Sequence, residues 1–159
     1  MWVENNRVRI HKGFMTLKDF NDFLEELGNR LNLKETPVVM HFRITTHGGT
    51  KPENCHPFPI SDNVNTLKKL QFVTDIGVAH NGIIHSVTPR TGISDTMEYI
   101  ASQLVYIKKS NQKFYKDKNM IQLIENAIGS KMAFLTASGE IYTIGHFEEE
   151  NGILYSNTN

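Results

Sequence analysis

Polar side chains gather in four short stretches of this chain, each beside a predicted strand or helix. Arginine and aspartate side chains can hold a zwitterion, and asparagine and glycine N–H groups can stabilise a negatively charged oxygen. We therefore expect the stretches to line one pocket for an amino-acid-like ligand. They read His-Phe-Arg-Ile-Thr-Thr-His-Gly (41–48), Asn-Cys-His-Pro-Phe (54–58), His-Asn-Gly (80–82) and Ser-Asp-Thr (94–96).

The arginine of the first stretch needs an anionic partner. In a strand, His41, Arg43 and Thr45 share one face beside apolar neighbours, and burying an unpaired guanidinium is costly. A ligand carboxylate held by two hydrogen bonds would satisfy it. An internal salt bridge with Asp95 or Glu53 would do so too, and the residues alone favour this simpler alternative.

The third and fourth stretches each have a local structural explanation. Asn81-Gly82 is first of all a turn signal, although both residues could donate N–H groups to an oxyanion. Asp95 belongs to a Ser-Asp-Thr helix start, although its carboxylate could bind a ligand ammonium group.

Cys55 is followed directly by His56, a combination that suggests a catalytic pair. A catalytic thiolate needs a base beside it in space, and adjacent side chains usually point apart. We therefore expect a structural cysteine. A zinc site built from these two residues with His41 and His47 lacks a recognisable ligand spacing, so no metal or other cofactor is predicted.

The composition is that of a single domain covering residues 1–159. Seventeen basic and seventeen acidic residues give zero net charge, which removes the electrostatic argument for a nucleic-acid or membrane partner. No apolar run reaches the roughly 20 residues that span a bilayer. One cysteine cannot form an internal disulfide, so the cytoplasm is the expected location.

Periodicity and turn signals predict an α+β fold with helices on both sides of the sheets. Residues 38–44 are apolar on both faces, as in a central strand, and the helix at 16–30 should bury one apolar face in the core. The predicted strands and hairpins lie at 2–10, 38–44, 76–79, 131–147 and 153–156, and the predicted helices at 16–30, 94–109 and 120–128.

Together and in this order, the stretches resemble the class II glutamine amidotransferases of the N-terminal-nucleophile hydrolase superfamily. The matching residues are 41–48, 54–58, Ala-His-Asn-Gly-Ile-Ile (79–84) and Ser-Asp-Thr-x-Glu (94–98). The resemblance covers roughly residues 37–105, and the whole chain is similar to short phage and bacterial versions. It implies a four-layer αββα sandwich.

The resemblance also implies roles in binding glutamine. Arg43 would hold the α-carboxylate and Asp95 the α-ammonium group. Asn81 and Gly82 would form the oxyanion hole for the side-chain amide. Thr46 and His47 would shape the same loop, while His56 and His80 would support the loops.

One feature departs from the family pattern. The family nucleophile is a cysteine directly after the initiator methionine, whereas this chain begins Met1-Trp2 and has no cysteine nearby. The resemblance thus implies that the first strand is missing, either because the chain is a truncated form or because it is a non-catalytic relative.

Two functions follow from these alternatives. One is a glutaminase-type domain that hydrolyses glutamine when a longer form supplies the cysteine. The other is a non-catalytic phage-type protein that binds or inhibits a host protein. A missing strand would leave a sheet edge unpaired, so a protein partner or a homodimer at that edge is also expected.

Overall fold

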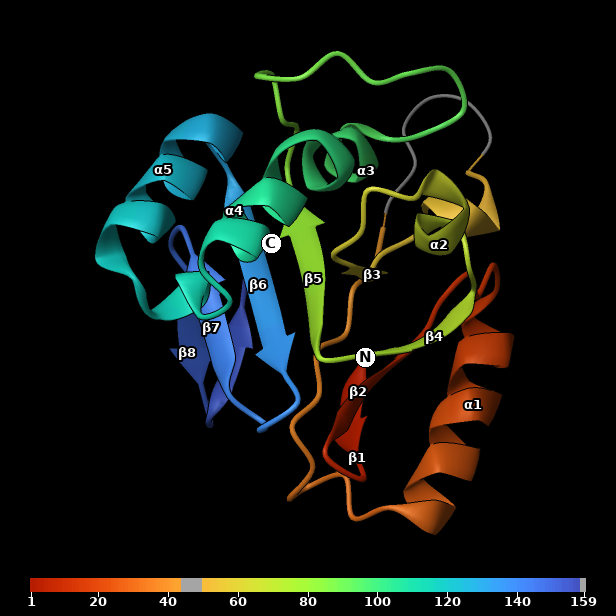
Figure 1. The fold of residues 1–159 in the computed structure, drawn as a ribbon. Helices are drawn as coiled ribbons and strands as arrows, with labels where there is room; N and C mark the ends of the chain where they lie inside the picture. The colour runs from red at the N-terminus through yellow and green to blue at the C-terminus, as the bar shows by residue number, and fades with distance from the viewer. Residues whose placement is uncertain (44–49, 158–159) are drawn as a thin grey trace.

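The computed structural model describes residues 1–43 and 50–157, and it shows a mixed α+β fold (Figure 1). Its strands are β1 (Trp2–Glu4), β2 (Arg7–His11), β3 (Phe58–Pro59), β4 (Gln71–Thr74), β5 (Ile76–Asn81), β6 (Lys131–Thr136), β7 (Ile141–Ile144), β8 (Glu148–Glu150) and β9 (Ile153–Tyr155). Its α-helices are α1 (Leu17–Arg30), α2 (Val64–Leu67), α3 (Asp95–Tyr99), α4 (Val105–Ser110) and α5 (Lys118–Ile128). A π-helical segment, Ile100–Leu104, joins α3 to α4, and short 3₁₀ helices occupy Pro52–Asn54 and Phe114–Lys116.

The strands form two larger sheets and a separate hairpin. The first sheet has the order β1-β2-β4 and the second β3-β5-β6-β7, while β8 pairs only with β9. All of these pairings are antiparallel. Strands β4 and β5 are consecutive in the chain but belong to different sheets, so the chain passes from one sheet to the other at Asp75.

The apolar side chains form two clusters that hold these sheets and helices together. One cluster lies between the two larger sheets and includes Val8, Ile10, Ala79 and Leu135. The other lies between the second sheet and helices α3, α4 and α5. Five apolar residues of the predicted helix at 94–109 are buried there: Met97, Ile100, Ala101, Leu104 and Val105.

Helix α1 lies on the other side of the first sheet, away from α3–α5 (Figure 1). Thr16 caps this helix, because its hydroxyl accepts a hydrogen bond from the Asp19 N–H at 3.1 Å. The expectation that its whole apolar face is buried is wrong. Only Leu27 is buried, whereas Phe20, Phe23 and Leu24 are half-exposed and Leu17 is 69% exposed, because a groove separates α1 from residues 38–43.

The predicted central strand at 38–44 is also wrong over its described part. Residues 38–43 contain one isolated bridge, between Val38 and Trp2, and no ladder. Met40 is 48% exposed and Phe42 is 67% exposed. The backbone bonds between this segment and β1 are those between Met1 and Val39, and residues 40–43 have no backbone hydrogen bond to the other described residues.

None of the helices in the described parts of the chain combines the length and apolar character needed to cross a membrane.

Candidate functional site

Four of the six residues predicted for ligand binding line one cleft of about 760 Å³. Arg43 reaches it from the extended segment that follows Val39. Asn81 and Gly82 lie at the end of β5, and Asp95 lies at the start of α3. The other two, Thr46 and His47, lie outside the described residues.

Asp95 connects the turn after β5 to the start of α3. One carboxylate oxygen accepts a hydrogen bond from the Ile84 N–H at 2.7 Å, and the other accepts from the Thr96 N–H at 2.8 Å. The helix cap itself is Ser94, whose hydroxyl accepts from the Met97 N–H. An ionised carboxylate can accept about four hydrogen bonds, so Asp95 retains acceptor capacity for a ligand.

Asn81 and Gly82 are held in place by residues that are distant in the sequence. The Asn81 side-chain amide donates to the Ser156 hydroxyl at 2.9 Å, and Lys131 donates to the Ser156 carbonyl. Gly82 has a φ of 131°, and a Cβ atom there would lie 2.6 Å from the Ser130 Cβ. Only glycine fits this position, and the Asn81 amide has a second N–H that can bind a ligand.

Arg43 forms no ion pair within residues 1–43 and 50–157. The predicted alternative, an internal salt bridge to Asp95 or Glu53, is therefore wrong within those residues. Arg43 is exposed at the edge of the cleft, where its charge is open to an anionic ligand.

Three histidines form a network behind the cleft. His80 contacts the Thr96 hydroxyl through Nδ1 at 2.9 Å and the Ser130 hydroxyl through Nε2 at 2.6 Å. His56 Nε2 contacts the same Thr96 hydroxyl at 3.3 Å, and His41 Nε2 lies 3.0 Å from the His80 carbonyl oxygen. These contacts tie the loops to β5 and α3.

Burial keeps these imidazoles neutral near pH 7. It lowers the pKa of His41 to about 4 and the pKa of His56 well below its usual value. Burial also lowers the pKa of His80, although the nearby Asp95 carboxylate opposes the shift. The wall behind the cleft therefore carries no histidine charge under neutral conditions.

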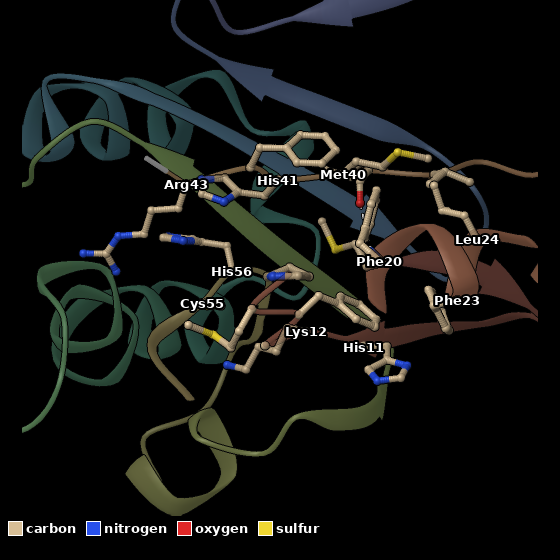
Figure 2. A pocket seen from close by; sticks show the side chains of 18 of the residues that line it. His11, Lys12, Phe20, Phe23, Leu24, Met40, His41, Arg43, Cys55 and His56 are labelled. Carbon is tan, nitrogen blue, oxygen red and sulfur yellow. Dashed lines mark hydrogen bonds between the residues drawn. The ribbon is translucent and has the colours of Figure 1, made fainter. Parts of the chain in front are cut away.

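A second cavity, the groove, has a volume of about 350 Å³ and shares His41, Phe42, Arg43 and His56 with the cleft. Figure 2 shows the groove, with Phe20, Phe23, Leu24 and Met40 at one end and Lys12, Cys55 and His56 at the other. Its lining contains no acidic residue among those described.

Cys55 faces this groove and does not line the cleft. Burial raises the pKa of its thiol, which donates a weak hydrogen bond to the Lys51 carbonyl at 3.8 Å. Within the described residues no hydrogen bond joins Cys55 to His56, and no group of three potential ligands converges on a metal position. The geometry therefore agrees with a structural cysteine.

Lys12 is a buried polar residue beside the groove. Its ammonium group donates to the Leu67 carbonyl at 2.7 Å and the Glu53 carbonyl at 3.1 Å, and it lies 3.9 Å from the centre of the Phe58 ring. Burial lowers its pKa to about 7. Its sequence neighbours carry no signal of this burial, because the burial depends on segments 41 and 55 positions away.

Comparisons with known proteins returned no matching family model, no matching curated protein and no matching solved structure.

Proposed function

We propose that this chain is a glutamine-binding domain of the class II glutamine amidotransferase type. In this proposal α1 forms one outer layer, α3, α4 and α5 form the other, and the two larger sheets form the inner layers of the αββα sandwich of that family. The observation that carries the proposal is that two side chains of opposite charge line the same cleft without bonding to each other. Arg43 has no ion-pair partner among the described residues, and Asp95 keeps acceptor capacity on the same cleft.

A bound glutamine would use both charges and the polar turn between them. Arg43 would hold the α-carboxylate through two hydrogen bonds, and Asp95 would accept from the α-ammonium group. The free Asn81 amide N–H and the Gly82 backbone N–H would donate to the side-chain amide oxygen. These last two donors would stabilise the negative charge that forms on this oxygen during attack on the amide carbon.

Hydrolysis needs a nucleophile, and no cysteine lines the cleft in the described part of the chain. A cysteine thiolate supplied by a longer form would attack the amide carbon, ammonia would leave, and water would then hydrolyse the thioester to glutamate. Without that cysteine the same cleft would bind glutamine and turn nothing over. This second candidate is a non-catalytic protein that acts by binding, and the cleft without a cysteine favours it.

Calorimetric titration of L-glutamine into the chain tests the proposal. Replacing Arg43 with lysine keeps the charge but removes the planar fork, and Asp95→Asn removes the charge that faces the ammonium group. We expect each change to weaken binding at least about tenfold, the size expected when a charge-assisted hydrogen bond is lost. Replacement of the exposed Arg7 with lysine is the matched control and should bind as wild type.

A second ligand distinguishes the contribution of Arg43 to binding from that of Asp95. 4-Carbamoylbutanoate is glutamine without its α-amino group, so Asp95→Asn should not weaken its binding, whereas Arg43→Lys should. Absence of glutamine binding to the wild-type chain at millimolar concentration would contradict the proposed function. Glutamate release by this chain would exclude the non-catalytic alternative.

A further inference from the structure

The shortest contact in the histidine network joins His80 to Ser130. The His80 Nε2 atom and the Ser130 hydroxyl oxygen are 2.6 Å apart. His80 is 3% exposed in β5, whereas Ser130 is half-buried between Gly129, which ends α5, and the start of β6. The two residues meet because the end of β5 lies beside the start of β6, where Asn81 pairs with Lys131 (Figure 1). A buried imidazole therefore faces a hydroxyl group that is only half-buried.

Two further side chains continue this line on the other side of the His80 ring. The His80 Nδ1 atom lies 2.9 Å from the Thr96 hydroxyl oxygen, which lies 3.5 Å from the Asp95 carboxylate oxygen Oδ1. A hydroxyl, an imidazole, a second hydroxyl and a carboxylate thus follow one another. This is the order of a serine–histidine–acid triad with one hydroxyl group inserted before the acid.

The hydrogen-bonding capacity of Thr96 indicates where the His80 proton lies. A hydroxyl group donates one hydrogen bond and accepts two. When Thr96 donates to the negatively charged Asp95, it can accept an N–H from His80 and another from His56 Nε2, which lies 3.3 Å away. All three polar neighbours of Thr96 are then satisfied. His80 is protonated at Nδ1 in this arrangement, so the lone pair of its Nε2 atom faces Ser130.

The Ser130 hydroxyl has two acceptors within reach. The Ile128 carbonyl oxygen lies 2.9 Å away, and His80 Nε2 is nearer at 2.6 Å. Burial lowers the pKa of His80, so the ring is neutral near pH 7 and Nε2 can take a proton. The Asp95 carboxylate opposes this shift, and it would stabilise the imidazolium that forms when the serine proton moves.

Two glycines leave space around Ser130. A Cβ atom at Gly82 would lie 3.3 Å from the Ser130 hydroxyl oxygen and 3.7 Å from His80 Nε2. A Cβ atom at Gly145 would lie 2.9 Å from the Ser130 carbonyl oxygen. Neither neighbour therefore covers the serine with a side chain. Ser130 lines neither the cleft nor the groove, so a reactant has to be small to reach its hydroxyl.

We propose that Ser130 is a nucleophile toward small acyl esters, with His80 as its general base and with Thr96 and Asp95 as residues that position His80. The Ser130 oxygen attacks the ester carbonyl carbon while its proton moves to His80 Nε2. The bond to the leaving oxygen then breaks, and the departing alcohol takes the proton from Nε2. Water, activated by the same nitrogen, attacks the acyl-serine, releases the carboxylic acid and restores the hydroxyl.

The first probe is diisopropyl fluorophosphate, added to the full chain and located by peptide mass spectrometry. Its phosphorus bonds to a serine oxygen and loses fluoride, which leaves a stable ester. We expect an adduct on Ser130 and none on Ser138, an exposed serine whose hydroxyl contacts Thr136. The rate of labelling should be constant between pH 7 and pH 8 and should fall below pH 6.5, because protonated His80 cannot accept the serine proton.

Variants separate this chemistry from a purely structural network. His80→Gln removes the base and should slow labelling at least about 100-fold, the size of a general-base contribution. Thr96→Ser keeps the hydroxyl group and should label as wild type with the same pH profile, whereas Thr96→Val should label more slowly. Absence of an adduct on Ser130, or a rate that rises in proportion to hydroxide, would overturn the proposal. Equal labelling of wild type, His80→Gln and Thr96→Val would overturn it too.

Turnover of 4-nitrophenyl acetate tests the water step. Release of 4-nitrophenol should continue beyond one equivalent per chain and should disappear in Ser130→Ala. Release that stops after one equivalent, or that Ser130→Ala retains, would overturn the hydrolysis. Neither reagent carries the α-amino and α-carboxylate groups of glutamine, so these results do not depend on whether the cleft binds glutamine.

Discussion

The buried histidines behind the cleft predict a loss of stability in mild acid. Burial lowers the pKa of His41 from 6.5 to about 4. The unfolded chain therefore takes up a proton at this residue near pH 6.5, while the folded chain does not until about pH 4. The stability that the neutral His41 side chain contributes to the folded state is fully present above pH 6.5 and is lost as the pH falls toward 4.

The size of the effect follows from the two pKa values. Each pH unit between them changes the free energy of unfolding by about 1.4 kcal/mol. Integrated from pH 7 to pH 5, His41 alone lowers the free energy of unfolding by ~2 kcal/mol. His56 and His80 act in the same direction, because burial lowers their pKa values as well.

Urea unfolding at pH 7, 6 and 5 measures this loss. The variant His41→Gln keeps an N–H donor for the His80 carbonyl but cannot titrate, so its stability should fall by ~2 kcal/mol less than that of wild type over this range. Replacing the exposed His146 with glutamine is the control and should leave the pH dependence unchanged. If His41→Gln retains the full wild-type pH dependence, burial of His41 is not the cause.

Two further predictions concern stability at neutral pH, measured by thermal or urea unfolding. Gly82→Ala should cost roughly 3 kcal/mol from positive φ and overlap with Ser130, whereas Gly152→Ala, at a φ of 78° with open space around it, should cost only about 1 kcal/mol. Similar losses at the two glycines would contradict the close contact. Leu27→Ala should cost about 3 kcal/mol because Leu27 is 2% exposed, whereas the 69% exposed Leu17→Ala should cost less than about 0.5 kcal/mol. Equal losses at the two leucines would mean that α1 buries its whole apolar face.

Local signals in the sequence correctly located most turns and helix ends. Asn5 and Asn6 adopt positive φ in the hairpin predicted at 2–10. Gly129, in the left-handed conformation, ends α5 where the helix predicted at 120–128 should end. These signals are reliable because a turn or a helix end depends on the backbone conformation and hydrogen bonds of residues only a few positions apart.

The pairing of strands was harder to predict because it depends on distant partners. Residues 38–43 have the composition of a central strand but lack a partner beyond Val39 in the described structure. Within residues 71–79 the sequence predicts one strand, at 76–79. The structure has two, β4 and β5, and Asp75 between them is the point where the chain passes from one sheet to the other. Hydrophobic pattern identifies extended segments but does not reveal which neighbour provides their hydrogen bonds.

In the site too, some residues could be predicted from local sequence, whereas their distant partners could not. Asn81, Gly82 and Asp95 could be chosen from the sequence because each stands at the end or start of a regular element. Arg43 could be chosen because a guanidinium beside apolar residues needs an anionic partner. Their supports could not: Ser130 lies 50 positions from His80 in the sequence, and Ser156 lies 75 positions from Asn81. Serines at such distances carry no local pattern that would mark them as partners.

The contact between Asn81 and Ser156 also affects the order in which the cleft can form. Asn81 belongs to a central strand whose sheet is complete once β7 has paired, but its side chain is fixed only by a residue that follows the last hairpin. Contacts between positions so far apart in the sequence form more slowly than local pairing. We therefore expect the donor side of the cleft to be completed after the sheet that carries it, so that ligand binding requires the segment after β9 to be in place.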